Sequence, residues 1–384
     1  MVEWKTIGEI FETRNGYTPS TSNKLFWEGG NIPWFKMEDI RDHGGILYDS
    51  YSHITEQAVK GKGLFKANSI LLATSATIGE HALIMTEHLS NQRFTNFYPK
   101  SQYEQMVNMR YVYYYMFIID DWCKQHINQG GFASVDMNGL FNLSFPVPLL
   151  SEQQRIVGIL DMFTASIDNL KAQIAQRRKQ YEYYRDQLLD LEGKPGVEMK
   201  TIIDLCKSCC SGGTPSTSNK EYYNGNIPWL RTQEVDWNEI YDTEIKITDE
   251  AIANSSAKLI PENCVIVAMY GATAAKVAIN KIPLCTNQAC CNLEICEDKA
   301  LHKFVYHWLC REYLNLKAMG EGSQNNINGQ KVKGYRIPVP SLSAQRRIVS
   351  VLDTFELSLR NLECQLKGRE AQYEYYRNKL LTFE

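Results

Sequence analysis

Long hydrophobic runs and a strong net charge are both missing from this 384-residue sequence. No apolar stretch approaches the ~18 residues of a membrane span, and the N-terminal Met-Val-Glu-Trp-Lys does not resemble a signal peptide. We therefore expect a cytoplasmic protein that does not enter a membrane. The net charge of −3 argues against tight binding of nucleic acid by this chain alone, because such binding usually needs a strongly basic domain.

Residue patterns of catalytic and metal sites are missing as well. The seven histidines show no metal-ligand spacing, and no Ser/His/Asp arrangement can be argued. The one candidate phosphate loop, Gly271–Lys276, lacks the second glycine and the Ser or Thr after the lysine that hold phosphate and magnesium. The eleven cysteines of a cytosolic chain indicate reduced thiols rather than a disulfide framework. We expect no catalytic residue and no cofactor on this chain.

The sequence contains one unit of about half its length twice. The offset between the copies is 195 to 196 residues early in each half and 192 later, so the unit is a whole domain with an appendage rather than a solenoid repeat. Such pseudo-two-fold symmetry suits a partner that is itself two-fold, such as a bipartite DNA site or a pair of identical subunits. The clearest matches are residues 18–24 with 214–220, 31–34 with 226–229, 145–148 with 337–340, and 180–185 with 372–377.

Each copy ends in a predicted long helix, over residues 151–192 and 341–384. Apolar or aromatic residues recur there at alternating steps of four and three, which predicts a left-handed coiled coil. Each helix follows a Pro-x-Pro, and Ser151 and Ser341 or Ser343 are candidate N-caps. About 40 residues at ~1.5 Å each give a rod of ~60 Å. The seams are Ile156, Leu160, Phe163, Ile167, Leu170, Ile174, Arg177, Tyr181, Tyr184, Leu188, and Ile348, Leu352, Phe355, Leu359, Leu362, Leu366, Arg369, Tyr373, Tyr376, Leu380.

The equal lengths and matching seams favour antiparallel packing of the two helices on each other. They could serve only as a structural hairpin, but their surplus of aromatic and polar residues is typical of a protein interface. Gln153 and Gln345, near the starts of the helices, are polar residues that support an interface together with the neighbouring arginines. The predicted partner-binding residues are Gln154, Arg155, Tyr183, Tyr184, Arg346, Arg347, Tyr375 and Tyr376.

The two globular halves have the mixed pattern of α/β (α+β) domains. Short β-type runs such as Ser69–Ala73 and Cys264–Ala268 lie between Gly- and Asn-rich turns, and helical stretches occur near Arg110–Ile119 and Leu301–Tyr313. Residues 193–196, Gly-Lys-Pro-Gly, form the clearest linker. We expect two globular domains, residues 1–150 and 193–340, and helical spacers at 151–192 and 341–384.

Differences between the copies indicate where the two halves could have different binding specificities. Residues 130–136 oppose 322–328, and residues 74–77 oppose 269–272, in predicted loops that exchange small or apolar groups for amide-bearing or aromatic ones. Such exchanges would change which base is read if these loops contact DNA, because Asn and Gln pair with adenine and Arg or Lys with guanine. Ordinary drift between duplicated loops is the alternative. Shared positions, such as Asn91-Gln92 and Asn287-Gln288, indicate scaffold.

Two rival chemistries are disfavoured by the same comparison. Cysteines in the second half could bind zinc, but Cys206, Cys285 and Cys290 match apolar residues of the first half, so small buried side chains explain them better. A nuclease would need the acidic pattern that Asp236 and Glu244 suggest, and the first half lacks it.

The ordered motifs resemble the specificity (S) subunit of Type I restriction–modification systems. The pattern is Gly-Gly-Thr-Pro-Ser, Asn-Ile-Pro-Trp, a Pro-x-Pro, then Gln-Arg-Ile-Val and a long helix. It occurs twice, and the resemblance covers essentially the whole chain. Two departures are Tyr17, where the second half has Gly213, and the cysteine-rich second half. The resemblance implies two tandem pseudo-symmetric target-recognition domains separated by an antiparallel two-helix coiled coil.

The family resemblance also implies partners and cofactors. Each recognition domain would read one part of a split double-stranded DNA target, and the helices would dock two modification (M) subunits. The M subunits would bind S-adenosylmethionine and methylate adenine, and restriction (R) subunits would use ATP and Mg. This chain has no Asn/Asp-Pro-Pro-Tyr/Phe stretch of an adenine methylase, so we expect it to be non-catalytic. A protein–protein scaffold without DNA readout is the alternative.

The predicted DNA contacts lie in the repeated motifs and in the loops that differ. Hydroxyls and lysines would position the DNA backbone, and Lys36, Arg231, Tyr270, Gln324 and Asn325 would face bases. Two sites one helical turn apart on DNA are about 34 Å from each other, a span that a ~60 Å rod covers. The full set is Ser20, Ser22, Asn23, Lys24, Lys36 and Gln129 in the first domain, and Ser216, Ser218, Asn219, Lys220, Arg231, Tyr270, Gln324 and Asn325 in the second.

Overall fold

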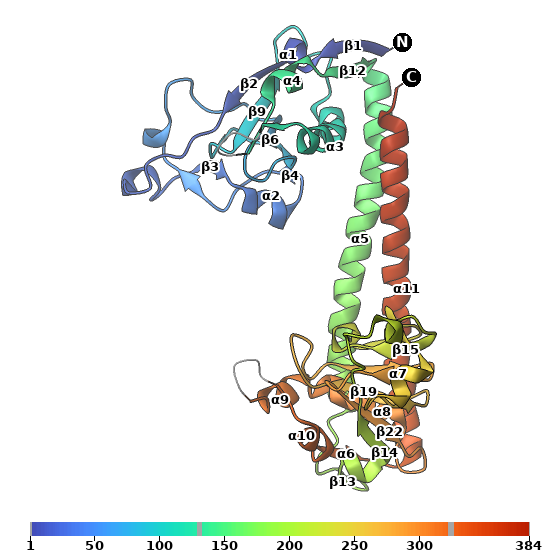
Figure 1. Cartoon of the computed structure of the whole chain (residues 1–384). Helices are drawn as coiled ribbons and strands as arrows, with labels where there is room; N and C mark the ends of the chain where they lie inside the picture. The colour runs from blue at the N-terminus through green and yellow to red at the C-terminus, as the bar shows by residue number, and fades with distance from the viewer. Residues whose placement is uncertain (1, 129–132, 322–325, 384) are drawn as a thin grey trace. The chain divides into compact units, whose positions relative to one another are not determined.

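The computed structural model describes residues 2–128, 133–321 and 326–383. The chain forms two compact units, which we call unit 1 (Met1–Leu170 with Gln365–Glu384) and unit 2 (Lys171–Cys364). Each unit contains one α/β part and a segment of both long helices, α5 (Leu150–Leu188) and α11 (Leu342–Leu381) (Figure 1). Across the described ranges, no helix combines the length and the apolar character needed to span a bilayer.

Unit 1 is built on a five-stranded sheet of order β2-β9-β6-β7-β4, in which only the β4–β7 pair is parallel. A smaller sheet has the order β5-β3-β8, and β1 pairs with β12. The strands are β1 (Val2–Thr6), β2 (Phe11–Asn15), β3 (Ile32–Phe35), β4 (Ile46–Leu47), β5 (His53–Ile54), β6 (Ser69–Ala73), β7 (His81–Ile84), β8 (Leu89–Ser90), β9 (Phe94–Pro99), β10 (Ile127–Asn128), β11 (Ser134–Val135) and β12 (Ser144–Pro148), and the helices are α1 (Ile7–Ile10), α2 (Met37–His43), α3 (Met109–Gln125) and α4 (Met137–Asn142).

Unit 2 repeats the topology of the five-stranded sheet strand for strand, and its smaller sheet has one additional strand. Its five-stranded sheet has the order β14-β22-β19-β20-β16, its second sheet the order β17-β15-β21-β18, and β13 pairs with β23. The strands are β13 (Glu198–Thr201), β14 (Cys206–Ser211), β15 (Ile227–Leu230), β16 (Asn238–Ile240), β17 (Ile245–Ile247), β18 (Leu259–Ile260), β19 (Val265–Ala268), β20 (Val277–Asn280), β21 (Leu284–Thr286), β22 (Cys290–Ile295) and β23 (Arg336–Val339), and the helices are α6 (Ile202–Leu205), α7 (Asp249–Ala253), α8 (His302–Arg311), α9 (Tyr313–Ala318) and α10 (Gly329–Lys333).

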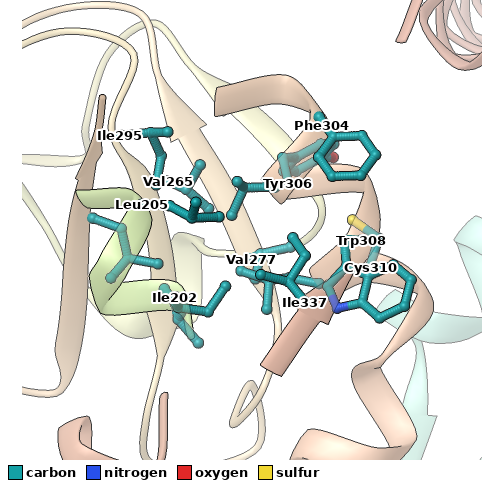
Figure 2. Packing of buried hydrophobic residues seen from close by; sticks show 14 of the residues in the cluster. Ile202, Leu205, Val265, Val277, Ile295, Phe304, Tyr306, Trp308, Cys310 and Ile337 are labelled. Atoms are coloured by element: carbon teal, nitrogen blue, oxygen red, sulfur yellow. The ribbon is translucent and has the colours of Figure 1, made fainter. Parts of the chain in front are cut away.

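The central strand of each five-stranded sheet is buried at every position because both of its faces are covered, and its side chains are apolar except for Ser69 in β6. In β19, Val265 and Val267 pack into the core beneath α8, and Ile266 and Ala268 pack into the core beneath the smaller sheet. Figure 2 shows the first of these cores, where Val265 lies among side chains from α6, α8, β20 and β23. This two-sided burial confirms the strands predicted at Ser69–Ala73 and Cys264–Ala268, the second of which begins one residue later.

The cysteines of unit 2 contribute to the same cores. Cys285 and Cys290 are fully buried among apolar side chains, and Cys206 is half-buried against the core beneath α8. These positions confirm the interpretation of these cysteines as small buried side chains.

The two long helices begin where the Pro-x-Pro segments end. Ser341 caps α11, because its hydroxyl accepts a hydrogen bond from the amide of Ala344 at 3.3 Å. The prediction of Ser151 as the cap of α5 is wrong. The helix starts one residue before it, and the amides of Glu152 and Gln153 donate to the carbonyl of Leu149.

Within each unit the two helices run antiparallel, as predicted. In unit 2, Tyr184 stacks on Phe355 with ring centroids 5.4 Å apart, and Arg178 pairs with Glu363 at 2.6 Å, so residue numbers rise along α5 as they fall along α11. Unit 1 has the equivalent stack of Phe163 on Tyr376, also at 5.4 Å. Arginine guanidinium groups cover both phenylalanine rings, Arg177 over Phe355 and Arg369 over Phe163, each at 5.7 Å.

Two glutamines attach the long helices to the α/β parts. Gln153 and Gln345 are fully buried, so the sequence-based argument that placed them on the interface surface is wrong. The Gln153 side chain accepts from the Asn108 amide and donates to the carbonyls of Met106 and Pro148, all at 2.8 Å. These bonds hold the start of α3 against the start of α5.

Candidate nucleic-acid interface

Hydrogen bonds in unit 1 bring together the segments that the sequence comparison singled out. The hydroxyl of Thr18, at the start of the Thr-Pro-Ser motif, donates to the Gln92 side chain at 2.6 Å. The Thr74 amide donates to the Arg93 carbonyl at 3.0 Å, and the Thr74 carbonyl accepts from Val135 at 2.9 Å. We call these segments, the described residues of 18–24, 74–80, 91–93 and 127–135, the loop cluster of unit 1.

Unit 2 builds the same cluster with the same backbone bonds. The Thr214 hydroxyl donates to Gln288, and the Met269 amide donates to the Ala289 carbonyl at 2.8 Å. The Met269 carbonyl accepts from Ile327 at 2.8 Å. The loop cluster of unit 2 is therefore 214–220, 269–276, 287–289 and the described residues of 321–327. The predicted variable loops thus lie next to each other in both units, on a shared backbone frame.

The tryptophan of the Asn-Ile-Pro-Trp motif fixes the first segment of each cluster. The indole N–H of Trp34 donates to the Tyr17 carbonyl, and that of Trp229 donates to the Gly213 carbonyl, each at 3.0 Å. The preceding glycine must lack a side chain, because a Cβ at Gly16 would lie 2.2 Å from the Asn91 carbonyl oxygen. The motif therefore acts as scaffold, as predicted.

The departure at Tyr17 has a structural explanation. The Tyr17 hydroxyl donates to the Ala58 carbonyl at 3.0 Å and accepts from the Lys60 amide at 2.8 Å. In unit 2 a Cβ at the matching Gly213 would lie 2.3 Å from the Ala257 amide, so the backbone itself comes close there.

The predicted contacts in the repeated Ser-Asn-Lys segments serve first to shape them. Ser20 and Ser22 share a hydrogen bond at 2.9 Å, and Ser216 and Ser218 share one at 2.7 Å. The side-chain oxygens of the asparagines cap short 3₁₀ turns: Asn23 accepts from Leu25 and Asn219 from Glu221. Of the two exposed lysines, Lys24 lies 3.5 Å from Glu28, and Lys220 has no ion-pair partner among the described residues.

The predicted base-facing residues differ in their availability. Arg231 is mostly buried, and its guanidinium is paired with Glu244 and lies 3.8 Å from Glu234. Lys36 lies 3.3 Å from Glu38. Tyr270, in contrast, is 41% exposed in the loop cluster of unit 2. Gln129, Gln324 and Asn325 lie outside the described residues.

Arg93 is a cation in the loop cluster that the prediction missed. Its side chain is exposed, and in the part of the chain that the structure describes its guanidinium has no hydrogen-bond or ion-pair partner. Its backbone is held firmly, since its amide donates to the Asn91 side chain at 3.0 Å. Unit 2 has the buried Ala289 at this position. The sequence carried the signal, because the residue after the shared Asn-Gln pair differs between the copies.

The predicted partner-binding residues form matching surfaces on the two long helices. Tyr183 and Tyr375 are 62% and 59% exposed, and each packs edge-on against the next tyrosine, at 5.3 and 5.2 Å between ring centroids. Tyr184 and Tyr376 lie in the stacks between the helices described above. The side chains of Gln154, Arg155, Arg346 and Arg347 are exposed, and Arg155 pairs with Glu152 at 2.6 Å.

A polar cluster joins α8 to α11 in unit 2. The buried His307 ring contacts Asp353 at 3.1 Å, and Lys303 donates to the same carboxylate at 2.8 Å. Burial opposes ionisation of Asp353, but these hydrogen bonds outweigh it and lower its pKa. Burial raises the pKa of the neighbouring Glu356, whose carboxylate lies 3.7 Å from His307.

The cluster has the donor types of a metal site, but side-chain cations of the chain already lie against its carboxylates. His307, Asp353 and Glu356 could contribute one ligand atom each. Lys303 pairs with Asp353 at 2.8 Å and Arg360 lies 3.6 Å from Glu356, and both cations also pair with Glu239. We therefore assign the cluster to the attachment of α8 and not to a metal.

Two copies of one α/β fold, each with a differently composed loop cluster and each tied to paired long helices, define a duplicated recognition protein. The chain belongs to the family described as Type I restriction modification DNA specificity domain, whose model matches residues 1–177 and 195–367. This finding confirms the family predicted from the sequence, and with it the fold class of two tandem recognition domains and an antiparallel helical region.

Comparison with individual proteins agrees with the family. The chain is 46% identical over 222 residues to the Type I restriction enzyme EcoprrI specificity subunit of Escherichia coli, covering 54% of each chain. It is 34% identical over 294 residues to the EcoR124I/EcoR124II specificity subunit of the same species, covering 72% of this chain and 71% of that one. The match thus spans only about half the length of the first of these relatives. The crystal structure of a Type I restriction-modification S subunit from M. genitalium shares the fold, with a TM-score of 0.63, 14% identity, and coverage of 100% of this chain and 97% of that one.

Proposed function

We propose that this chain is the non-catalytic subunit that gives a Type I restriction–modification complex its DNA sequence specificity. Unit 1 and unit 2 would each read one half of a bipartite, asymmetric target through their loop clusters. The observation that carries this proposal is the pair of loop clusters, which share backbone hydrogen bonds but present different side chains, such as Arg93 against Ala289. An asymmetric split target requires two domains with the same backbone arrangement and different side chains at the contact surface.

The long helices would recruit the enzymatic subunits. Two M subunits would dock on the matching surfaces around Tyr183 and Tyr375, because exposed tyrosine and arginine are the residues enriched in protein interfaces. The M subunits would hold S-adenosylmethionine and flip the target adenine, and R subunits would bring ATP and Mg. The chain itself would hold no cofactor, and the complex would act in the cytoplasm.

The near-neutral charge of the chain favours DNA binding that depends on contributions from the M subunits. The net charge is −3, and cations near the loop clusters such as Arg231 and Lys276 are paired with acidic residues. We therefore expect the isolated chain to bind DNA weakly and to gain affinity when M subunits close around the duplex. Tight, specific binding of DNA by the isolated chain in a titration would refute this part of the proposal.

The same charge balance supports the second candidate, a protein–protein scaffold with no DNA readout. To separate the two, the chain is co-expressed with the methyltransferase encoded beside it, and methylated adenines are mapped across the genome with and without the chain. A bipartite, asymmetric methylated motif that depends on the chain supports the first function. Methylation that stays the same on deleting the chain supports the scaffold.

A further inference from the structure

We propose that Arg93 reads a guanine in the half-site bound by unit 1, and that no equivalent contact exists in unit 2. This inference rests on the proposed function and assigns a specificity-determining residue to it. Arginine contacts the O6 and N7 atoms of guanine with two N–H groups in the major groove, which is the commonest specific contact between a protein and a base.

The position of Arg93 in the loop cluster meets the first requirement of a reader, a fixed backbone. Its amide donates to the Asn91 side chain at 3.0 Å, and its carbonyl accepts from Thr74 at 3.0 Å. The preceding Gln92 is held by the Thr18 hydroxyl. Arg93 is therefore tied to the turn after β6, which differs between the copies, and follows a residue held by the segment of the predicted contacts Ser20 to Lys24.

The availability of its charge meets the second requirement. Two other arginines of unit 1 are occupied: Arg41 pairs with Glu80 at 2.5 Å, and Arg14 donates to the carbonyls of residues 62–64. The Arg93 guanidinium is exposed and has no partner in the described residues. A free guanidinium can bind a base without first breaking an ion pair.

The comparison of the two units distinguishes a base contact from a phosphate contact. A group that positions the DNA backbone would serve both half-sites alike, because phosphates carry no sequence information. The shared Gln92 and Gln288 fit that description. Arg93 is present in one unit only, and its counterpart Ala289 is buried and apolar. A residue confined to one unit suits the bases, the part of the target in which the two half-sites differ.

The test uses the full chain co-expressed with its methyltransferase subunits in cells that lack other adenine methylation. Methylated motifs are mapped for the unaltered chain, Arg93→Ala, Arg93→Lys and the control Arg336→Ala. Arg336 is an exposed arginine on β23, outside the loop cluster. Tyr270→Ala identifies the half-site read by unit 2. Thermal unfolding checks that each variant is folded, which we expect because the Arg93 side chain supports no described contact.

We expect Arg93→Ala to lower the preference for guanine at one position, in the half-site that Tyr270→Ala leaves unchanged, by about 10- to 100-fold. Arg93→Lys should relax this position less than Arg93→Ala, because an ammonium group can reach the same guanine atoms but lacks the rigid two-pronged geometry of a guanidinium. Arg336→Ala should change nothing. An unchanged motif in Arg93→Ala overturns the inference while leaving the proposed function intact. A loss of methylation that is equal at all sequences and is restored in Arg93→Lys would also overturn the inference, because it marks a phosphate contact. Relaxation of the same position by the control Arg336→Ala would overturn it too. Absence of a bipartite motif with the unaltered chain overturns the proposed function and this inference together.

Discussion

The side-chain oxygen of Gln153 accepts a hydrogen bond from the backbone amide of Asn108 at 2.8 Å. Gln345 makes the same contact with the amide of Leu301 at 2.9 Å, so one amide side chain at the start of each long helix satisfies a free amide at the start of a helix in the α/β part. Both glutamines are fully buried. The attachment of each recognition domain to its helix is therefore a specific polar contact inside an apolar environment.

Replacement of Gln153 by alanine should lower the free energy of unfolding by about 1 to 2 kcal/mol, because it leaves the buried Pro148 carbonyl and the part-buried Asn108 amide and Met106 carbonyl without this partner. Chemical denaturation measures the effect. The matched control is Gln154→Ala at the exposed neighbouring position, which should change stability by less than about 0.5 kcal/mol. Equal effects at the two positions would show that the contact does not hold the domain to the helix.

The sequence alone was sufficient to predict the repeat, the antiparallel helices and the central strands, because each of these has a regular pattern. The seam residues of α5 and α11 recur every three or four positions, and β6 and β19 are apolar at every position except Ser69. The role of Gln153 was not predictable in this way. A glutamine among charged residues at a helix start is typical of an exposed position, and only the fold shows that two free carbonyls and an amide converge on it.

The sequence predicted which segments form the candidate interface, but not which of its cations are free of ion-pair partners. The repeated motifs and the loops that differ do meet in one loop cluster per unit. Whether a particular cation is available, however, depends on acidic residues that are distant in sequence, as with Arg41 and Glu80, 39 positions apart. The free guanidinium of Arg93 and the paired one of Arg231 could be told apart only from their surroundings.

The polar cluster of unit 2 predicts opposite effects of two conservative substitutions. The pKa of Asp353 is lower in the folded chain than its ordinary value of ~3.9, so its ionised form stabilises the fold at neutral pH. Asp353→Asn should therefore destabilise unit 2 at pH 7, by about 1 kcal/mol or more. This difference should shrink only when the pH falls below ~3.9 and should vanish below the folded-state pKa.

Glu356→Gln should instead stabilise unit 2 at pH 7. The pKa of Glu356 is raised by burial, so its ionised form costs stability above that pKa, and the cost disappears as the pH falls towards the unfolded-state value of ~4.3. The gain should diminish on acidification. Urea unfolding at several pH values measures both variants. Shifts of the same sign at pH 7 would contradict the assignment.

The tyrosine pairs predict how the number of bound M subunits changes. Tyr183→Ala and Tyr375→Ala each remove an exposed ring from one surface, so each should weaken one M subunit by about 2 kcal/mol, roughly 30-fold, with little effect on folding. Mass measurement of the complex should then show one M subunit per chain in place of two at limiting concentration. Tyr184→Ala and Tyr376→Ala differ from these variants, because they also remove a stack between the helices and should destabilise the chain by about 1 kcal/mol. Loss of both M subunits from a single Tyr183 variant would contradict two independent surfaces.

The length of the long helices should set the spacing of the methylated target. Both helices pass from one unit to the other, α5 between Leu170 and Lys171 and α11 between Gln365 and Cys364. Insertion of one heptad at each of these points leaves the contents of both units unchanged and preserves the 3.5-residue period of the seam. Seven residues lengthen a helix by ~10.5 Å, which corresponds to about three base pairs at ~3.4 Å each. Methylation mapping should therefore show the same two half-sites with a gap about three base pairs longer. Insertion in α5 alone is the control, because it leaves the two seams unequal in length and should reduce methylation without defining a new gap. An unchanged gap with both insertions would mean that the helices do not act as the ruler.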